Sequence, residues 1–392
     1  MTQATKRAAR ERRLHGLALA AFVGMAVILL HPLWAYNGVR VAGYDWFNYN
    51  WNFWFIRHVF QTPGLNVYMN DFAMFPALSN YGYHALAAFW YPLWALLEPL
   101  VGTLTTVNVI ITLVCVLNGY LTFAWLRTEG AAPGLALLGG LVLQTLPISR
   151  YFYYNTHLNL MDWFWLPGLL LLWRQIVRAA LAAGRGLARP WAALAWSVVF
   201  GVALWGLLLT DLQFPIFAAA VVVPYGVLTL LLGGLPGVAL SPRERWQGRL
   251  WLAICGLVAV AVGLSLMWFA GPFPYIARFQ GELVPGPAAD RPGIPFPQGF
   301  LSMAQAWWQW DQPSLGAFFP LLLLLTAIWA LARRASGERW SAAGRPRWTR
   351  WFWLAIAIPP LIFAMGPYLY VGGAQVTLPF IWLYDLTSGM FR

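Results

Sequence analysis

Apolar runs of about 20 residues divide the sequence, and a helix of this length can cross the hydrocarbon core of a bilayer. They lie at about 15–36, 104–126, 132–148, 160–178, 191–210, 212–233, 249–270, 314–332 and 351–369. The composition agrees, because 60% of the residues are hydrophobic and only 10% are charged, against about 25% charged in soluble domains. We therefore expect an all-α polytopic membrane protein with about nine transmembrane helices, give or take two.

Arginine and lysine divide unevenly between the two sets of connecting segments. With the N-terminus inside, the basic residues expected outside are Arg40, Arg57, Arg150, Arg278, Arg291 and Arg392, and all the others fall inside. The positive-inside rule therefore predicts a cytoplasmic N-terminus. Because topology accounts for the net charge of +12, we expect no nucleic-acid partner.

This topology divides the chain into a cytoplasmic basic tail (1–14), a transmembrane domain (15–369) and an outer C-terminal segment (370–392). The transmembrane domain includes two large outer loops, at about 37–103 and 271–312. The first apolar run is longer than the 7–15 residues of a signal-peptide core, so it predicts a retained helix rather than a cleaved signal.

The first outer loop begins with the aromatic-rich stretch "GYDWFNYNWNFWFIRH". Helical spacing over 45–58 predicts two faces. One carries Asp45, Asn48, Tyr49, Asn52 and Ile56, and the other carries Phe47, Trp51, Trp54 and His58. This pattern is typical of an amphipathic helix in the membrane interface. The later stretch 84–101 is apolar, but two prolines and an acid interrupt it, so we expect it to be interfacial or re-entrant.

Two carboxylates of this loop are candidates for chemistry. Asp45 could be a general base or a metal ligand, and the alternative is a helix N-cap. Asp71 could be a second carboxylate opposite Asp45, and the alternative is a turn residue. The acids could also bind a divalent metal ion together, although the sequence has no clear Asp-x-Asp motif.

The remaining candidates are polar residues predicted to lie on the same face of the membrane. They are the substrate-binding candidates Asn48, Asn52, Arg57, His84, Arg150, His157, Asp211 and Arg278. The three arginines could hold a phosphate, because an arginine fork matches phosphate oxygens. Each histidine could instead be structural, and Asp211 could be a helix cap. Motifs for nucleotide binding, serine hydrolysis or zinc are absent from the sequence.

Few polar residues fall within the apolar runs, chiefly Asn108, Asn118 and Gln144. Transporters often carry ionisable groups or broken helices near the midplane, so the chain looks more like an enzyme working at one membrane edge. Cys115 and Cys255 both lie in apolar runs and are expected to be unpaired and buried.

The order of these features resembles the GT-C superfamily of polytopic glycosyltransferases, in particular a bacterial branch of RgtA/B/C/D-like or uncharacterised membrane proteins. The aromatic stretch above carries the resemblance, together with "NVYMNDFAMFP", "TVNVIITLVCVLNGYLTFAWLR" and "LPISRYFYYNTHLNLMDWFWLPGLLLLWR". It covers about 40–235 well and the rest loosely. It implies a multi-pass protein of the bacterial plasma (inner) membrane.

The resemblance also implies an activity. Such enzymes move a sugar from a polyprenyl-phosphate donor to a glycan, lipid or protein acceptor on the outer face. An acid in their first outer loop is the catalytic base, which corresponds to Asp45, and Asp71 is the second acid by position. The alternatives are a lipid or lipid-linked glycan transporter, or an inactive or truncated fragment, because the chain stops after Phe391 and Arg392 where family members continue.

Overall fold

The computed structural model describes residues 3–35, 45–72 and 79–278, except 83, 85, 188, 236 and 237, and short stretches between 355 and 382. Over these residues the chain is mainly helical, with two short antiparallel hairpins. The helices are α1 (Gln3–Ala35), α2 (Trp46–Gln61), α3 (Tyr91–Val101), α4 (Thr103–Thr128), α5 (Pro133–Thr145), α6 (Pro147–Tyr154), α7 (Trp165–Gly184), α8 (Pro190–Thr210), α9 (Phe214–Leu232), α10 (Pro242–Phe269) and α11 (Phe273–Arg278). A 3-10 turn, η1 (Ala88–Trp90), precedes α3, and the hairpins pair β1 (Met69–Asn70) with β2 (Ser79–Asn80) and β3 (Tyr368–Val371) with β4 (Ala374–Thr377).

Six of the described helices are long and apolar enough to cross a membrane: α1, α4, α7, α8, α9 and α10. They correspond to six of the predicted spans, so the chain is a polytopic helical membrane protein. The run at 132–148 forms the shorter apolar helix α5. The predicted span at 314–332 lies outside the described residues, as does nearly all of 351–369.

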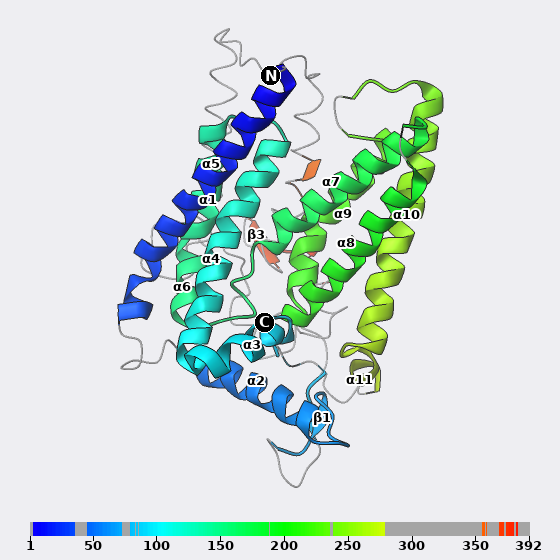
Figure 1. Ribbon diagram of the computed structural model, residues 1–392. Helices are drawn as coiled ribbons and strands as arrows, with labels where there is room; N and C mark the ends of the chain where they lie inside the picture. Colours follow the sequence, from blue (N-terminus) through cyan, green and yellow to red (C-terminus); the bar gives the residue numbers. More distant parts are fainter. Residues whose placement is uncertain are drawn as a thin grey trace.

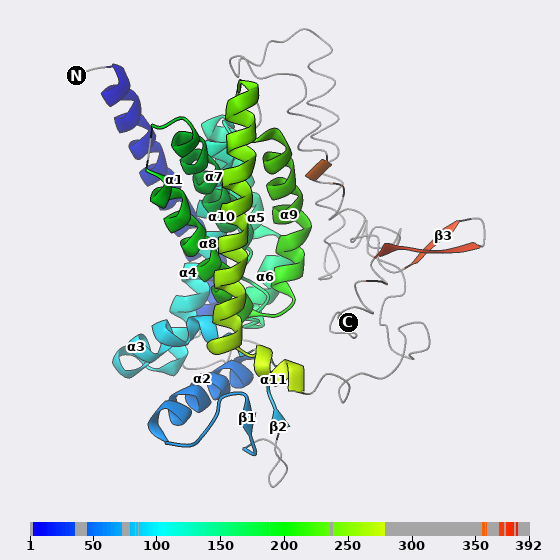
Figure 2. The same cartoon turned by 90° about the vertical axis from the view of Figure 1, so that its right-hand side faces the viewer.

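Figure 1 and Figure 2 show the two ends of the bundle. We call the end that holds α2, α3, α6 and α11 the aromatic end, and the end with the first turns of α1 and α10 and the last turns of α4, α7 and α9 the basic end. Among the described residues, the connections expected outside lie at the aromatic end, and those expected inside lie at the basic end. The helix α3 has 11 residues and lies at the aromatic end, which agrees with an interfacial segment rather than a span.

Glycines and small residues allow the helices to approach closely, as is common in membrane bundles. A Cβ added to Gly140 of α5 would lie 2.5 Å from the backbone oxygen of Gly119 in α4 and 2.5 Å from the ring of Phe22 in α1. The three helices therefore meet at this point. In the same way, a Cβ on Gly201 of α8 would lie 2.7 Å from the backbone oxygen of Ala259 in α10.

The helix α2 has the two faces that its spacing predicts. Tyr49, Asn52 and Ile56 are buried, whereas Phe47 is 65% exposed and Trp54 is 46% exposed. The helix α1 begins at Gln3, so most of the basic segment 1–14 forms its first turns and continues without a break into the first span. Arg174 is one of the basic residues that the topology assigns to the inside. In the structure it is a buried residue of α7.

Candidate functional site

The side chains of Asp45 and His157 pair at the aromatic end. The Asp45 Oδ2 atom lies 2.5 Å from the His157 Nδ1 atom, and the two side chains are 33% and 20% exposed. Asp45 occupies the N-cap position of α2, but its side chain makes no capping hydrogen bond. The carboxylate is therefore directed to the histidine and not to the helix backbone.

His157 is held by the short segment between α6 and α7. Its ring stacks on Tyr151 with 5.7 Å between the ring centroids and meets Phe152 edge-on. The preceding residue, Thr156, is fully buried and has a φ of 57°, a left-handed conformation that costs energy for a β-branched residue. The surrounding structure thus imposes the position of the imidazole.

Asn118 of α4 holds the segment between α6 and α7 in place through hydrogen bonds. Its Nδ2 atom donates to the Tyr153 hydroxyl at 2.8 Å and to the Met161 carbonyl at 2.9 Å, and its Oδ1 atom accepts from the Phe164 N–H at 2.6 Å. These bonds join the segment to the interior of a spanning helix. Asn118, a polar residue of this span, therefore positions the segment that carries His157.

A series of hydrogen bonds links Tyr49, Asn159 and Asp211 close to the pair. The Tyr49 hydroxyl donates to Asn159 Oδ1, and Asn159 Nδ2 donates to Asp211 Oδ2 at 2.5 Å. The Gln213 N–H donates to the other carboxylate oxygen of Asp211 at 2.5 Å. Burial raises the pKa of Tyr49 well above its usual value, and the charges of Asp45 and Asp211 add to this effect. These hydrogen bonds connect α2, the 155–164 segment and the turn between α8 and α9.

His84 adds a second imidazole to this end. Its Nε2 atom lies 3.2 Å from Asn52 Oδ1 on the buried face of α2. Burial lowers the pKa of His84, and the charge of Asp45 partly opposes the shift. His84 and Asp211 line a small pocket with Tyr68, Gly82, Thr210 and Pro272. The pocket connects His84 to the Tyr49–Asn159–Asp211 chain.

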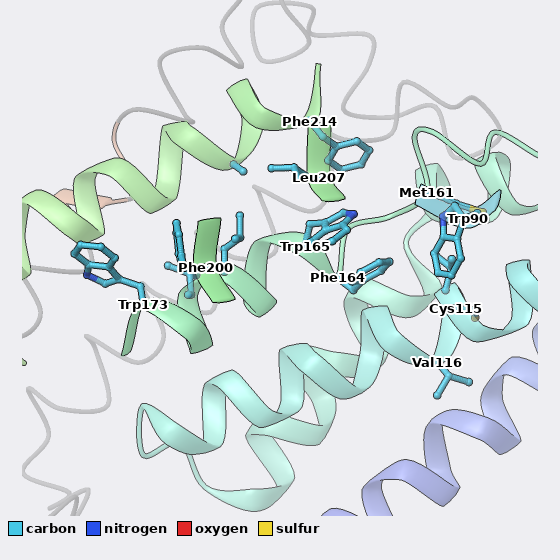
Figure 3. Packing of buried hydrophobic residues seen from close by; sticks show 14 of the residues in the cluster. Trp90, Cys115, Val116, Met161, Phe164, Trp165, Trp173, Phe200, Leu207 and Phe214 are labelled. Carbon is cyan, nitrogen blue, oxygen red and sulfur yellow. The ribbon is translucent and has the colours of Figure 1, made fainter. Parts of the chain in front are cut away.

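Asp162 is a fully buried carboxyl group. Its Oδ2 atom accepts from the Trp90 indole at 2.7 Å, and its Oδ1 atom has no hydrogen-bond partner among the described residues. Trp90, Met161 and Phe164 lie close together here (Figure 3). Burial in these surroundings raises the pKa of Asp162 well above its usual value. We therefore infer that the neutral acid is the form that the fold favours.

The variant Asp162→Asn tests this inference. Because the folded pKa is raised, the stability that the protonated acid contributes is fully present below the unfolded pKa of about 3.9 and is lost as the pH rises through the folded pKa. The amide cannot ionise, so we expect Asp162→Asn to raise the melting temperature at pH 8 relative to wild type and to have little effect at pH 4. Thermal unfolding in detergent at both pH values measures this difference. A lower melting temperature for the variant at pH 8 would show that the carboxylate is ionised and stabilised.

The structure does not bring Asp71 to the Asp45–His157 pair. The neighbouring Phe72 packs on the rings of Trp54, Phe55 and His58, in the C-terminal half of α2. Asp45 lies at the N-terminus of that helix, about 14–20 Å away along the axis at about 1.5 Å per residue. Asn48 is half-buried in the first turn of α2, three residues after Asp45. It is therefore nearer to the pair than Asp71 is.

The three arginines have different surroundings. Arg57 donates from Nη2 to Glu98 Oε2 at 2.9 Å, and its guanidinium lies 4.4 Å from the centre of the Trp94 ring. It therefore joins α2 to α3. Arg278 is exposed at the end of α11, 5.8 Å from the centre of the Tyr275 ring. Arg150 lies in α6, and its side chain is outside the described residues.

Within the described part of the chain, no group of three or more His, Cys, Asp or Glu side chains is arranged to hold a metal ion. Of the two acids expected to share one, Asp45 pairs with His157 and Asp71 lies elsewhere. Cys115 and Cys255 are both free and buried, as predicted.

Sequence reasoning missed three residues of this site: Tyr49, Asn159 and Asp162. Tyr49 lies on the predicted face of α2 that carries Asp45 and Asn52, but the sequence did not single it out as a site residue. Asn159 and Asp162 follow His157 in "THLNLMDW", and a run of polar residues between two apolar helices was the available signal.

Comparison with known proteins does not identify the chain: no protein-family model, curated protein or solved structure matches it. The fold and the site therefore define a class only, a polytopic helical membrane protein with a paired carboxylate and imidazole at one end of its bundle.

Proposed function

We propose that this protein is an integral membrane glycosyltransferase of the GT-C type. It moves a sugar from a polyprenyl-phosphate donor to an acceptor hydroxyl at the outer surface of a bacterial plasma membrane. The Asp45–His157 pair is the observation that carries the proposal, because a carboxylate bonded to one imidazole nitrogen orients the ring for proton transfer.

In this proposal the pair removes the proton of the acceptor hydroxyl. Among the described residues, His157 Nε2 has no hydrogen-bond partner, so it is available to accept that proton while Asp45 stabilises the resulting imidazolium. The freed oxygen attacks the anomeric carbon of the sugar, and the polyprenyl phosphate leaves. The Tyr49–Asn159–Asp211 chain holds the two elements that carry the pair at a fixed separation.

The location of the pair supports a lipid-linked substrate. It lies at the end of the bundle where α2 exposes Phe47 and Trp54, aromatic side chains of the kind that favour the headgroup region. Arg278 and Arg150 remain the candidate cations for the leaving phosphate, because Glu98 already binds Arg57. A sugar donor with a lipid tail would enter such a site from the bilayer.

The polar residues of the spans give less support to a transporter. Asn118 binds the 155–164 segment, Gln144 Nε2 donates to the Phe22 carbonyl at 2.8 Å, and Asn108 Nδ2 donates to the Leu33 carbonyl at 3.2 Å. Each joins elements of the bundle to one another. A substrate pathway would instead need such groups to face a cavity.

The test uses the full chain in proteoliposomes with a panel of radiolabelled polyprenyl-phosphate sugars and a membrane extract as acceptor source. We expect label to pass from at least one donor to an acceptor. Movement of a fluorescent lipid-linked sugar between the leaflets is measured in parallel. Movement of the lipid-linked sugar between leaflets without any sugar transfer would support the transporter instead. A folded protein that shows no activity of either kind would favour the inactive fragment.

A further inference from the structure

A large apolar cavity lies between α7, α8, α9 and α10, away from the Asp45–His157 pair. Its volume is about 560 Å³, and its walls are almost entirely hydrocarbon, including Trp173, Phe200, Ala218 and Gly256. The helices α9 and α10 run side by side along it (Figure 1 and Figure 2). Proteins rarely leave so large an apolar space empty, because its walls lose their packing partners.

A second hollow lies at the basic end of the same two helices. Its volume is about 450 Å³, and it is lined by Leu231, Leu232, Leu235, Val238, Leu240, Arg245 and Arg249. None of these described lining residues is acidic. The nearest acid in the sequence, Glu244, is instead engaged by Arg185 at 2.7 Å and by the Ser241 N–H at 2.8 Å. The two arginines therefore place positive charge at the end of an apolar hollow, and among the described residues no acid lines it.

The two hollows share no lining residue, but helical spacing places both along one edge of α9 and α10, and we call this edge the track. On α10, Arg245 and Arg249 are followed at four-residue intervals by Ala253 and Leu257. On α9, the corresponding edge is formed by Val223, Val227 and Leu231. Leu257 is 71% exposed and Val227 is 47% exposed, so the track is open toward the bilayer side of the bundle.

The length of the track fits one lipid tail. From Arg249 to Val260 the helix rises by about 16 Å at about 1.5 Å per residue. This is about half of the roughly 30 Å hydrocarbon thickness of a bilayer. A tail that starts at the arginines would therefore end near the middle of the membrane.

Backbone contacts between α9 and α10 fix the geometry of the basic end of the track. A Cβ on Gly248 would lie only 2.1 Å from the backbone oxygen of Gly233, so the end of α9 rests directly on α10. Arg249 donates from Nε and Nη2 to the Leu231 carbonyl at 3.0 and 2.6 Å, which holds its guanidinium at the end of α9. Arg245 is exposed one turn earlier, and among the described residues its side chain has no hydrogen-bond acceptor.

We propose that this track binds an anionic glycerophospholipid of the bilayer, with its phosphate at Arg245 and Arg249 and one acyl chain in the cavity between α9 and α10. Two cations next to a hydrocarbon channel complement the two parts of such a lipid. The site lies at the opposite end of the bundle from the proposed catalytic pair. It is a lipid-binding site separate from the sugar donor, and it stands whether or not the chain transfers sugars.

The test measures lipid binding to the purified, delipidated full chain by native mass spectrometry. The probes are phosphatidylglycerol and phosphatidylcholine with identical acyl chains. We expect wild type to bind one phosphatidylglycerol at least tenfold more tightly than phosphatidylcholine. Equal binding of the two lipids by wild type would overturn the proposal.

Substitutions separate the two parts of the site. The double variant Arg245→Gln and Arg249→Gln is expected to lose the preference, whereas Arg243→Gln retains it, because Arg243 lines a different hollow with Arg185 and Glu244. Gly256→Leu narrows the apolar cavity and is expected to weaken the binding of both lipids, with melting temperatures checked for every variant. A preference that survives in the double variant would contradict the phosphate site.

The competing occupant is another part of this chain, because the predicted spans at 314–332 and 351–369 are also apolar. A photoreactive phenylalanine analogue at position 257 distinguishes the two. Cross-links to phosphatidylglycerol support the proposal. Cross-links to peptides from 314–369, with no lipid adduct, would show that the chain itself fills the track and would overturn it.

Discussion

Asp45→Asn is expected to lower the rate of sugar transfer by about 10²–10⁴-fold, the range over which general base catalysis acts. The amide preserves the shape of the side chain but removes the negative charge that faces His157 Nδ1 at 2.5 Å. Without that charge the imidazolium formed during proton transfer loses its stabilising partner. Transfer is measured at initial rates in proteoliposomes, with the melting temperature as a check on folding.

Asp71→Asn is the matched control for this experiment. It makes the same chemical change in the same outer segment, but the adjacent residue Phe72 packs on the C-terminal half of α2, away from the pair. We expect its transfer rate to stay within about threefold of wild type, since surface substitutions away from special features have small effects. A loss as large as that of Asp45→Asn would return Asp71 to the catalytic site.

Arg174→Met is expected to cost about 3 kcal/mol of unfolding free energy, because removing one partner of a buried ion pair leaves the other charge buried. Arg174 donates from Nη1 to Glu129 Oε1, and the two side chains are 10% and 12% exposed. The Tyr225 hydroxyl also donates to Glu129 Oε1, at 3.3 Å. The pair therefore links the end of α4 to α7 and α9.

The double variant Arg174→Met with Glu129→Gln provides the comparison. It removes both charges, so we expect it to recover most of the lost stability. Unfolding in mixed micelles with increasing sodium dodecyl sulfate measures the three free energies. Equal stability of wild type and Arg174→Met would show that the pair is solvated and contributes little.

Much of the fold could be predicted because its signals are local. Length and hydrophobicity identify the spans that became α1, α4, α7, α8, α9 and α10, since each must cover the same hydrocarbon thickness. The helical repeat placed Tyr49, Asn52 and Ile56 on one face of α2, and all three are buried. The end of the short helix α5 was harder to predict, because Pro147 begins a new helix directly after it.

The site depends on contacts between distant segments, which local patterns do not encode. Asp45 and His157 were separate candidates, and their pairing depends on how Asn118 and Thr156 shape the turn before α7. Arg57 was expected to hold a phosphate, yet Glu98, on the next helix of the same loop, binds it. The residue type indicated the chemistry in each case, but the partner depended on the packing.

The coupling between Asp45 and His157 tests the central claim most directly. Initial rates of sugar transfer are compared for wild type, Asp45→Asn, His157→Gln and the double variant in the same proteoliposomes. If the two residues act as one proton-accepting unit, each single change lowers the rate strongly and the double change is hardly worse than the more damaging single change. Losses that multiply in the double variant, or single variants as active as wild type, would contradict the account.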